Sequence, residues 1–271
     1  LNKISEVEKT INLYLELRNE ALLKHKLSES EVSKWIFQMM SSDVENRLSS
    51  HVKKEAMISY VYHILRPTVM IKDDSEEIRD VQVFIAIRKA YAKEDIAFLR
   101  YNLFNQYLGR LSEQNLAEAS DRFAEGKKII DEQLNYPGRF KIYEYIKRQI
   151  PPFLILEEIM RSNHDKFREL ILEKEELNKK IAGACEIKYA NISAKVRRAI
   201  IRSIIFIFLS KVFLAFTIEG TYERLIYGYV MWPIIWLNIF IPVTLMIIVS
   251  FFIKAPDKEN TERIIGRIHS L

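Results

Sequence analysis

The longest apolar stretch of the chain runs from Val230 to Ile253, 24 residues without a charge. As a helix, at about 1.5 Å per residue, it is about 36 Å long and can cross a hydrocarbon core of about 30 Å. Trp232 and Trp236 lie near one end, where aromatic side chains anchor a span at the interface. Pro233 and Pro242 are tolerated in lipid. The length favours a transmembrane helix over the alternative, a buried helix of a soluble core.

A second apolar stretch, residues 203–218, precedes it and contains a lysine, Lys211. On an insertion scale its Leu, Ile, Phe and Val residues contribute roughly −3 to −7 kcal/mol, whereas a central lysine costs about +2.5 to +3.5. Insertion therefore remains favourable, and the uncharged neighbouring stretch favours it further. The pattern predicts a transmembrane hairpin over residues 203–253.

The basic residues that flank the two stretches predict the orientation of the hairpin. Five precede the first stretch, Arg224 alone lies between the two, and four follow the second. The positive-inside rule therefore places both ends in the cytoplasm and the short connection outside. We predict that the five residues of the juxtamembrane segment 187–202 bind anionic lipid headgroups: Lys188, Lys195, Arg197, Arg198 and Arg202.

The formal net charge of +5 does not indicate a nucleic-acid-binding protein, because segment 187–202 alone accounts for it. Segment 187–202 contains five Lys and Arg residues and no acidic residue, so the rest of the chain has no net charge. A local basic cluster beside an apolar span is typical of a membrane surface. We therefore expect a lipid bilayer as a partner, and no nucleic acid.

Lys211 admits two hypotheses. In an antiparallel hairpin it lies at about the depth of Asn238, roughly 12 Å inside the outer interface, and the amide oxygen is a suitable acceptor. The favoured hypothesis is that Lys211 reaches the interface or pairs with Asn238 and sets the register of the hairpin. The alternative is that several copies assemble, so that Lys211, Asn238 and the outer-loop carboxylates Glu219 and Glu223 line a polar groove or pore.

Residues 1–186 predict a cytoplasmic bundle of amphipathic helices. Helix breakers are rare in the chain, with seven Gly and seven Pro, and apolar positions recur at spacings of three and four. Breaks are expected at Pro67, at Gly109, at the Tyr136-Pro137-Gly138 turn and at Pro151-Pro152. The expected fold class is all-α, with domains at residues 1–186, 187–202, 203–253 and 254–271.

A long helix is expected after the Pro151-Pro152 pair, leading towards the membrane. Its apolar positions alternate at spacings of four and three, as in a heptad seam with two polar interruptions: Leu156, Met160, Asn163, Phe167, Leu170, Lys174, Leu177 and Ile181. One face of a helical bundle is the favoured interpretation, and a coiled coil that joins several copies is the alternative. The tail 254–271 predicts a short amphipathic cytoplasmic helix that lies on the inner leaflet or docks on the bundle.

No catalytic, cofactor or metal motif is found. The five histidines have no ligand spacing, the seven glycines form no phosphate-binding loop, and there is no G-x-S-x-G elbow. Cys185 is the single cysteine, so no disulfide forms within the chain. We therefore expect a protein that is not an enzyme and holds no cofactor.

Several segments resemble an uncharacterised family of bacterial membrane proteins: YAKEDIAFLRYNLFNQYLGRL, DEQLNYPGR, QIPPFLILEE, KVRRAIIRSIIFIFLSK and the closing AP-x-x-EN. The resemblance implies a helical cytoplasmic region followed by two spans near the C-terminus, and it implies no activity. The layout is also similar to that of CorA magnesium channels and calcium uniporter pore subunits. The loop EGTYERLIYGYV lacks the Gly-Met-Asn of the first, and no Asp-x-x-Glu of the second precedes the last span.

Two functions are consistent with these patterns. The leading hypothesis is a helical interaction or scaffold protein of the bacterial inner membrane, which binds a protein partner or itself. The alternative is an oligomeric ion channel, transporter or insertase-like component that uses Lys211 and Asn238.

Overall fold

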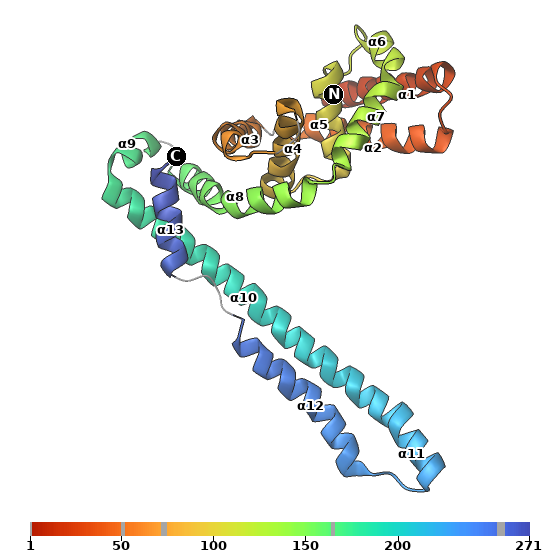
Figure 1. Ribbon diagram of the computed structural model, residues 1–271, viewed down its shortest axis with the longest axis vertical. Coiled ribbons are helices and arrows are strands. Elements are labelled where there is room, and N and C mark those ends of the chain that lie inside the picture. The colour runs from red at the N-terminus through yellow and green to blue at the C-terminus, as the bar shows by residue number, and fades with distance from the viewer. Residues whose placement is uncertain (1, 50–51, 72–74, 164–165, 254–257) are drawn as a thin grey trace. The chain divides into compact units, whose positions relative to one another are not determined.

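The computed structural model describes residues 2–49, 52–71, 75–163, 166–253 and 258–271 (Figure 1). The described residues form helices, turns and loops without a strand, so the predicted all-α fold class is confirmed. The chain divides into two compact units, residues 1–157 with residue 271, and residues 158–270. We call them the N-terminal unit and the C-terminal unit. The predicted domain boundaries at residues 186 and 202 both fall within one continuous helix.

The N-terminal unit is a succession of helices connected by short turns. Their bounds are α1 (Asn2–Lys24), α2 (Glu29–Leu48), α3 (Val52–Leu65), α4 (Glu76–Ile87), α5 (Ile96–Leu108), α6 (Leu116–Asp121), α7 (Phe123–Leu134) and most of α8 (Arg139–Ser162). A 3₁₀ turn (Arg66–Thr68) follows α3 at the predicted break, Pro67. A π-helical turn, η2 (Arg88–Ala92), follows α4.

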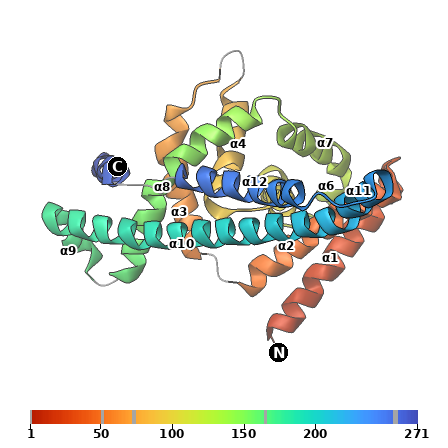
Figure 2. The same cartoon turned by 90° about the horizontal axis from the view of Figure 1, so that it is seen from below.

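Two apolar cores hold this unit together. In the first, the indole of Trp35 meets the rings of Phe104 and Phe123 edge-on, with centroids 6.1 and 5.4 Å apart, where α1, α2, α5, α6 and α7 meet. In the second, α3, α4 and α8 pack through residues that include Leu65, Ile146 and Phe153. Helix α4 contributes to both cores and so joins them. Figure 2 shows α1 and α2 side by side.

The predicted break at Pro151-Pro152 is wrong, because α8 continues through both prolines to Ser162. A proline inside a helix removes a backbone donor and costs about 3 kcal/mol in isolation. Here Ile146, Ile150 and Phe153, on both sides of the pair, are all buried in the second core. Burial of these side chains on one helical face offsets the lost hydrogen bonds.

The predicted continuous helix over residues 156–181 is also wrong. Helix α8 ends at Ser162, where the amide of Asn163 donates to the Ile159 carbonyl at 3.0 Å and caps the helix end. A short helix, α9 (Phe167–Leu172), follows, and the long helix α10 (Lys174–Leu214) begins only after Glu173, whose ψ of 86° is not helical. A long helix that leads into a second apolar helix is confirmed. Whether it joins several copies as a coiled coil stays a prediction.

The C-terminal unit consists of this long helix and the segments that pack along it. Helix α10 continues through a π-helical turn, η3 (Ala215–Glu219), into α11 (Gly220–Tyr227). The chain then reverses into α12 (Trp232–Phe251), and the last helix is α13 (Lys258–His269). Both views show α12 running back beside α10 (Figures 1 and 2). The elements predicted to form the transmembrane hairpin are therefore adjacent and antiparallel.

Candidate functional site

The hairpin of α10, η3, α11 and α12 has an apolar surface that the protein itself does not cover. Both helices are long and apolar enough to cross a membrane, and only 6% and 11% of their most apolar stretches are buried. Where the two helices touch, Ala215, Ile235 and Ile239 form a small buried core. A core helix of a soluble protein is mostly buried, so this exposure favours lipid as the surrounding medium.

Lys211 lies on α10, partly exposed, within this apolar surface. No hydrogen bond or salt bridge joins it to another described residue, and the amide of Asn238 instead donates to Glu219 Oε2 at 3.3 Å. The predicted pairing of Lys211 with Asn238 is therefore absent. The physical reason is that the π-helical turn η3 places Glu219 where its carboxylate reaches the partner helix.

Glu219 and Glu223 were predicted in an outer loop, and the structure corrects this, because they lie in η3 and α11. Gly228, with φ of 77°, ends α11 in the left-handed conformation that glycine adopts readily. The nearly buried Glu223 accepts a hydrogen bond from the backbone N–H of Met231 at 2.7 Å, directly before α12. Glu223 therefore has a structural role in the reversal of the chain.

The five basic residues of segment 187–202 all lie on α10. At 100° per residue, four of them fall on one side of the helix within about 80°, because they are spaced at seven, three and four positions: Lys188, Lys195, Arg198 and Arg202. Arg197 lies on the opposite side. Lys188 is half-buried and the other four are exposed. The structure thus provides a basic stripe directly before the apolar hairpin.

The tail helix α13 docks on α10, which decides between the two positions predicted for it. The amide of Asn260 donates to the Tyr189 hydroxyl at 2.7 Å, and His269 Nε2 lies 2.7 Å from Asn178 Oδ1. Ile264 and Ile268 are buried, as are Leu177, Ile181 and Cys185 of α10. Burial raises the pKa of the Cys185 thiol, beside Tyr189 and Thr261.

Cys185 should therefore report whether α13 is docked. In the native protein we expect slow reaction with a thiol reagent, because the thiol is fully buried and its raised pKa lowers the thiolate fraction. Ile264→Asp places a charge in the α10–α13 contact and should increase the labelling rate at least about tenfold. The matched control Glu262→Asp alters an exposed position of the same helix. Equal labelling rates for the two variants contradict the docked arrangement.

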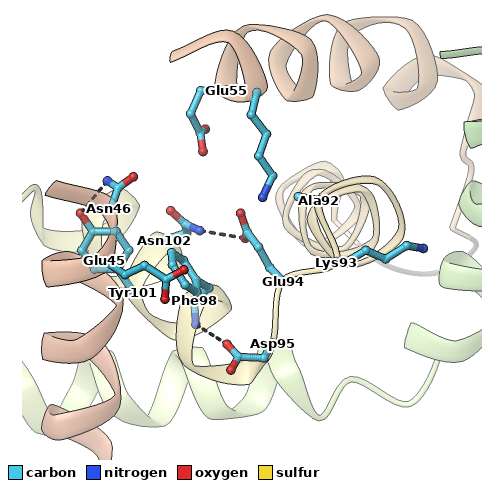
Figure 3. Close-up of a pocket in the computed structure, with 11 residues that line it drawn as sticks. Glu45, Asn46, Glu55, Ala92, Lys93, Glu94, Asp95, Phe98, Tyr101 and Asn102 are labelled. Atoms are coloured by element: carbon cyan, nitrogen blue, oxygen red, sulfur yellow. Dashed lines mark hydrogen bonds between the residues drawn. The ribbon is translucent and has the colours of Figure 1, made fainter. Parts of the chain in front are cut away.

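A polar pocket of about 300 Å³ opens in the N-terminal unit, between α2, α3 and the turn that joins η2 to α5 (Figure 3). Its lining includes two lysines, Lys54 and Lys93, of which Lys93 directs its ammonium away from the pocket. The other charged and aromatic lining residues are four acids and two aromatics: Glu45, Glu55, Glu94, Asp95, Phe98 and Tyr101. Lys93, with φ of 59°, is in the left-handed region that a non-glycine residue seldom occupies. This bend and the preceding π-helical turn separate two helices that the apolar pattern alone predicts as one.

Glu94 is the most enclosed of these carboxylates, with a side chain 6% exposed. Its Oε1 accepts from Arg88 Nη1 at 2.8 Å. Its Oε2 accepts from the Asn102 amide at 3.0 Å, as Figure 3 shows. Arg88 also donates to both carboxylate oxygens of Glu55, at 3.1 and 2.6 Å. Burial raises the pKa of Glu94, while the positive charges of Arg88 and Lys54 oppose the rise. No Ser, Thr, Cys or His is among the described lining residues.

The raised pKa of Glu94 makes the stability of the N-terminal unit depend on pH. The folded state binds the Glu94 proton more tightly than the unfolded chain, whose glutamate has the ordinary pKa of 4.5. Protonation of Glu94 therefore stabilises the folded state. This stabilisation is fully present below the pKa of Glu94 in the unfolded chain and is lost as the pH rises through its pKa in the folded state. Glu94→Gln lacks this titration, so the stability of wild type relative to this variant should fall as the pH rises above about 4.5.

The measurement is denaturant unfolding followed by Trp35 fluorescence in the detergent-solubilised full chain. Trp232→Phe and Trp236→Phe remove the other two tryptophans, so the signal reports only the unit that contains Trp35. The exposed Glu31 supplies the control Glu31→Gln, for which we expect no comparable trend. A relative stability that rises with pH contradicts the prediction.

No family model, curated protein or solved structure matches this chain. The resemblance to a bacterial membrane protein family stays a prediction, and it assigns no role to any residue. The sequence placed all nine of its candidate residues in the C-terminal unit and missed the Glu94 pocket. The left-handed Lys93 is the cause, since no Gly or Pro in the segment AKEDI marks the bend.

Proposed function

We propose that this protein is a membrane-anchored helical interaction protein. The hairpin holds the chain in the inner membrane of a bacterium, both ends lie in the cytoplasm, and the N-terminal unit binds a protein partner there. The observation that supports the anchor is the apolar, unburied surface of the hairpin, which costs free energy in water at about 25 cal/mol per Å².

The basic stripe on α10 supports the orientation. Its exposed members Lys195, Arg198 and Arg202 directly precede the first span, and Arg224 is the only basic residue between Lys211 and the end of α12. Juxtamembrane basic residues are retained on the cytoplasmic side, where each contributes about 1 kcal/mol of attraction to anionic headgroups. The stripe therefore favours a cytoplasmic location for the start of the hairpin.

Single-cysteine labelling tests this arrangement. On a Cys185→Ala background, Gly266→Cys places a thiol on the exposed side of α13, where an added side chain meets no neighbouring atom. Tyr229→Cys places one at the exposed reversal between the spans. A membrane-impermeant reagent applied to intact cells should label position 229 and leave position 266 unlabelled. The reverse pattern, or recovery of the chain in the soluble fraction, contradicts the proposal.

The interaction role is tested by cross-linking the full-length protein in native membranes and identifying the linked peptides by mass spectrometry. We expect links from residues 1–157 to one recurrent protein, because this unit has its own packed cores outside the hairpin. The links should decrease for Asp43→Ala, which destabilises this unit. Absence of any such protein contradicts the interaction role while leaving the anchor unaffected.

A second candidate function, an ion channel, transporter or insertase-like component, is favoured by the polar groups in the hairpin. Lys211 and the Glu219–Asn238 pair lie within the apolar surface, and intramembrane ionisable residues often mark ion or substrate pathways. Purified protein in lipid vesicles should then conduct ions, and Lys211→Leu should abolish the flux. Vesicles that remain impermeable to small cations and anions contradict this second function.

A further inference from the structure

Lys211, Glu219 and Asn238 retain hydrogen-bonding capacity that the hairpin does not use. The ammonium of Lys211 has no hydrogen bond or salt bridge to a described residue, and Asn238 Oδ1 accepts no hydrogen bond from one. By contrast, the hydroxyls of Ser210 and Thr217 donate to the carbonyls one turn earlier in their own helix, each at 2.7 Å. These two hydroxyls therefore need no further partner. The ammonium of Lys211 still needs one, because lipid tails offer no hydrogen-bond acceptor.

The position of Lys211 along α10 makes the interface hard to reach. It lies nine residues after Arg202 and eight before Glu219, which is about 12 to 14 Å from either flank at helical rise. A lysine near a helix end bends its side chain out to the headgroups, but this is least effective in the middle of a span. An acceptor within the apolar layer is the better solution for this ammonium.

Glu219 lies near the outer end of the span, and its carboxylate reaches back from there to the amide of Asn238. Ala215, one turn after Lys211, packs against Ile235 and Ile239, so Asn238 lies about one helical turn from the level of Lys211, which is within reach of a lysine side chain. The hydrogen bond from the Asn238 amide holds the Glu219 carboxylate at this partner helix, on the exposed side of the hairpin. One hairpin therefore carries a cation without a partner and, about one helical turn further towards the outer end, an anion beside an open amide oxygen.

We propose that the hairpin associates with a second copy of this chain, such that Lys211 of each copy binds the Glu219–Asn238 pair of the other. This inference rests on the proposed function, in which the hairpin is inserted in the membrane, and it names the partner that the hairpin binds there. The charge complementarity supports it, because two copies in the same orientation satisfy both sites at once in a two-fold arrangement. In lipid such contacts between polar side chains stabilise helix association.

Charge reversal in mixed membranes tests the pairing. Two differently tagged copies are co-expressed, solubilised in mild detergent and purified through one tag. Wild-type copies should co-purify, whereas Lys211→Glu paired with itself, or Glu219→Lys paired with itself, should reduce co-purification about tenfold, as the strength of intramembrane polar contacts suggests. When one copy carries Lys211→Glu and the other carries Glu219→Lys, both contacts have opposite charges again, and co-purification should recover.

The controls separate this inference from the proposed function. Lys180→Glu reverses an exposed charge of α10 outside the hairpin and should leave co-purification unchanged. Each variant is first checked for retention in the membrane after alkaline extraction, since release refutes the anchor itself. Lys211→Leu favours insertion and should still reduce association about tenfold. Retention in the membrane with unchanged association of the single variants, or without recovery in the mixture, overturns the pairing alone.

Discussion

Asp43→Ala should lower the free energy of unfolding of the N-terminal unit by about 3–5 kcal/mol, because it removes one side of a buried charge network. The Asp43 side chain is fully buried. Its Oδ1 accepts from Arg47 Nε at 3.0 Å, from the Tyr101 hydroxyl at 3.1 Å and from Arg110 Nη2 at 3.1 Å. Removing the carboxylate leaves these donors without their common acceptor and leaves a cavity between α2 and α5.

Denaturant unfolding monitored by Trp35 measures the effect, since Trp35 lies on the same helix, α2, as Asp43. The Trp232→Phe and Trp236→Phe background again isolates this signal. Asp43→Asn keeps the size of the side chain and should cost less than Asp43→Ala, because the amide oxygen still accepts one hydrogen bond. Glu45→Ala changes an exposed carboxylate two residues away and should alter the free energy by less than about 0.5 kcal/mol. Equal effects of Asp43→Ala and Glu45→Ala contradict the network.

Two arginines in the middle of α12 should prevent this helix from crossing the membrane. Ile241 and Leu245 are exposed on its surface, and each central arginine costs about 2.5–3.5 kcal/mol, whereas each Leu or Ile contributes about −0.3 to −0.6. The double variant Ile241→Arg with Leu245→Arg therefore loses roughly 6–8 kcal/mol of insertion free energy. That is about as much as all apolar side chains of α12 supply on the same scale.

Labelling of Gly266→Cys on the Cys185→Ala background shows the result. In the proposed topology α12 returns the tail to the cytoplasm. In the double variant, α13 should therefore become accessible from outside the cell, or the chain should appear in the soluble fraction. Ile241→Leu with Leu245→Ile keeps the apolar character and should leave position 266 unlabelled from outside. If the arginine variant behaves like this control, α12 is covered by protein and does not face lipid.

The two long apolar helices were predictable because they depend on the composition and length of contiguous residues more than on neighbours. The apolar run 230–253 is long enough by itself, and the run 203–218 outweighs the cost of Lys211. Even so, the connection was misjudged. The charges of Glu219, Glu223 and Arg224 suggested a loop, but the chain continues as η3 and α11 to Gly228, because this segment has good helix formers and Glu223 is satisfied by the Met231 N–H.

Local rules failed where packing outweighed them. Pro151 and Pro152 do not end α8, because the apolar residues on both sides are buried in one core. In contrast, the segment around Lys93, without Gly or Pro, bends into the left-handed region. The Arg88–Glu94 contact at 2.8 Å and the Asp95 cap on the Phe98 N–H at 3.0 Å hold this bend. Neither outcome follows from residue preferences.

The amino-acid sequence by itself determined that the protein is helical, that its last apolar runs form two long helices, and that a basic segment precedes them. Each of these properties follows from the periodicity or composition of contiguous residues. Only the tertiary structure decided that Glu219 meets Asn238, that α13 docks on α10, and that Arg88 joins Glu55 to Glu94 beside a polar pocket. These contacts depend on how distant segments pack, and packing is a property of the whole chain.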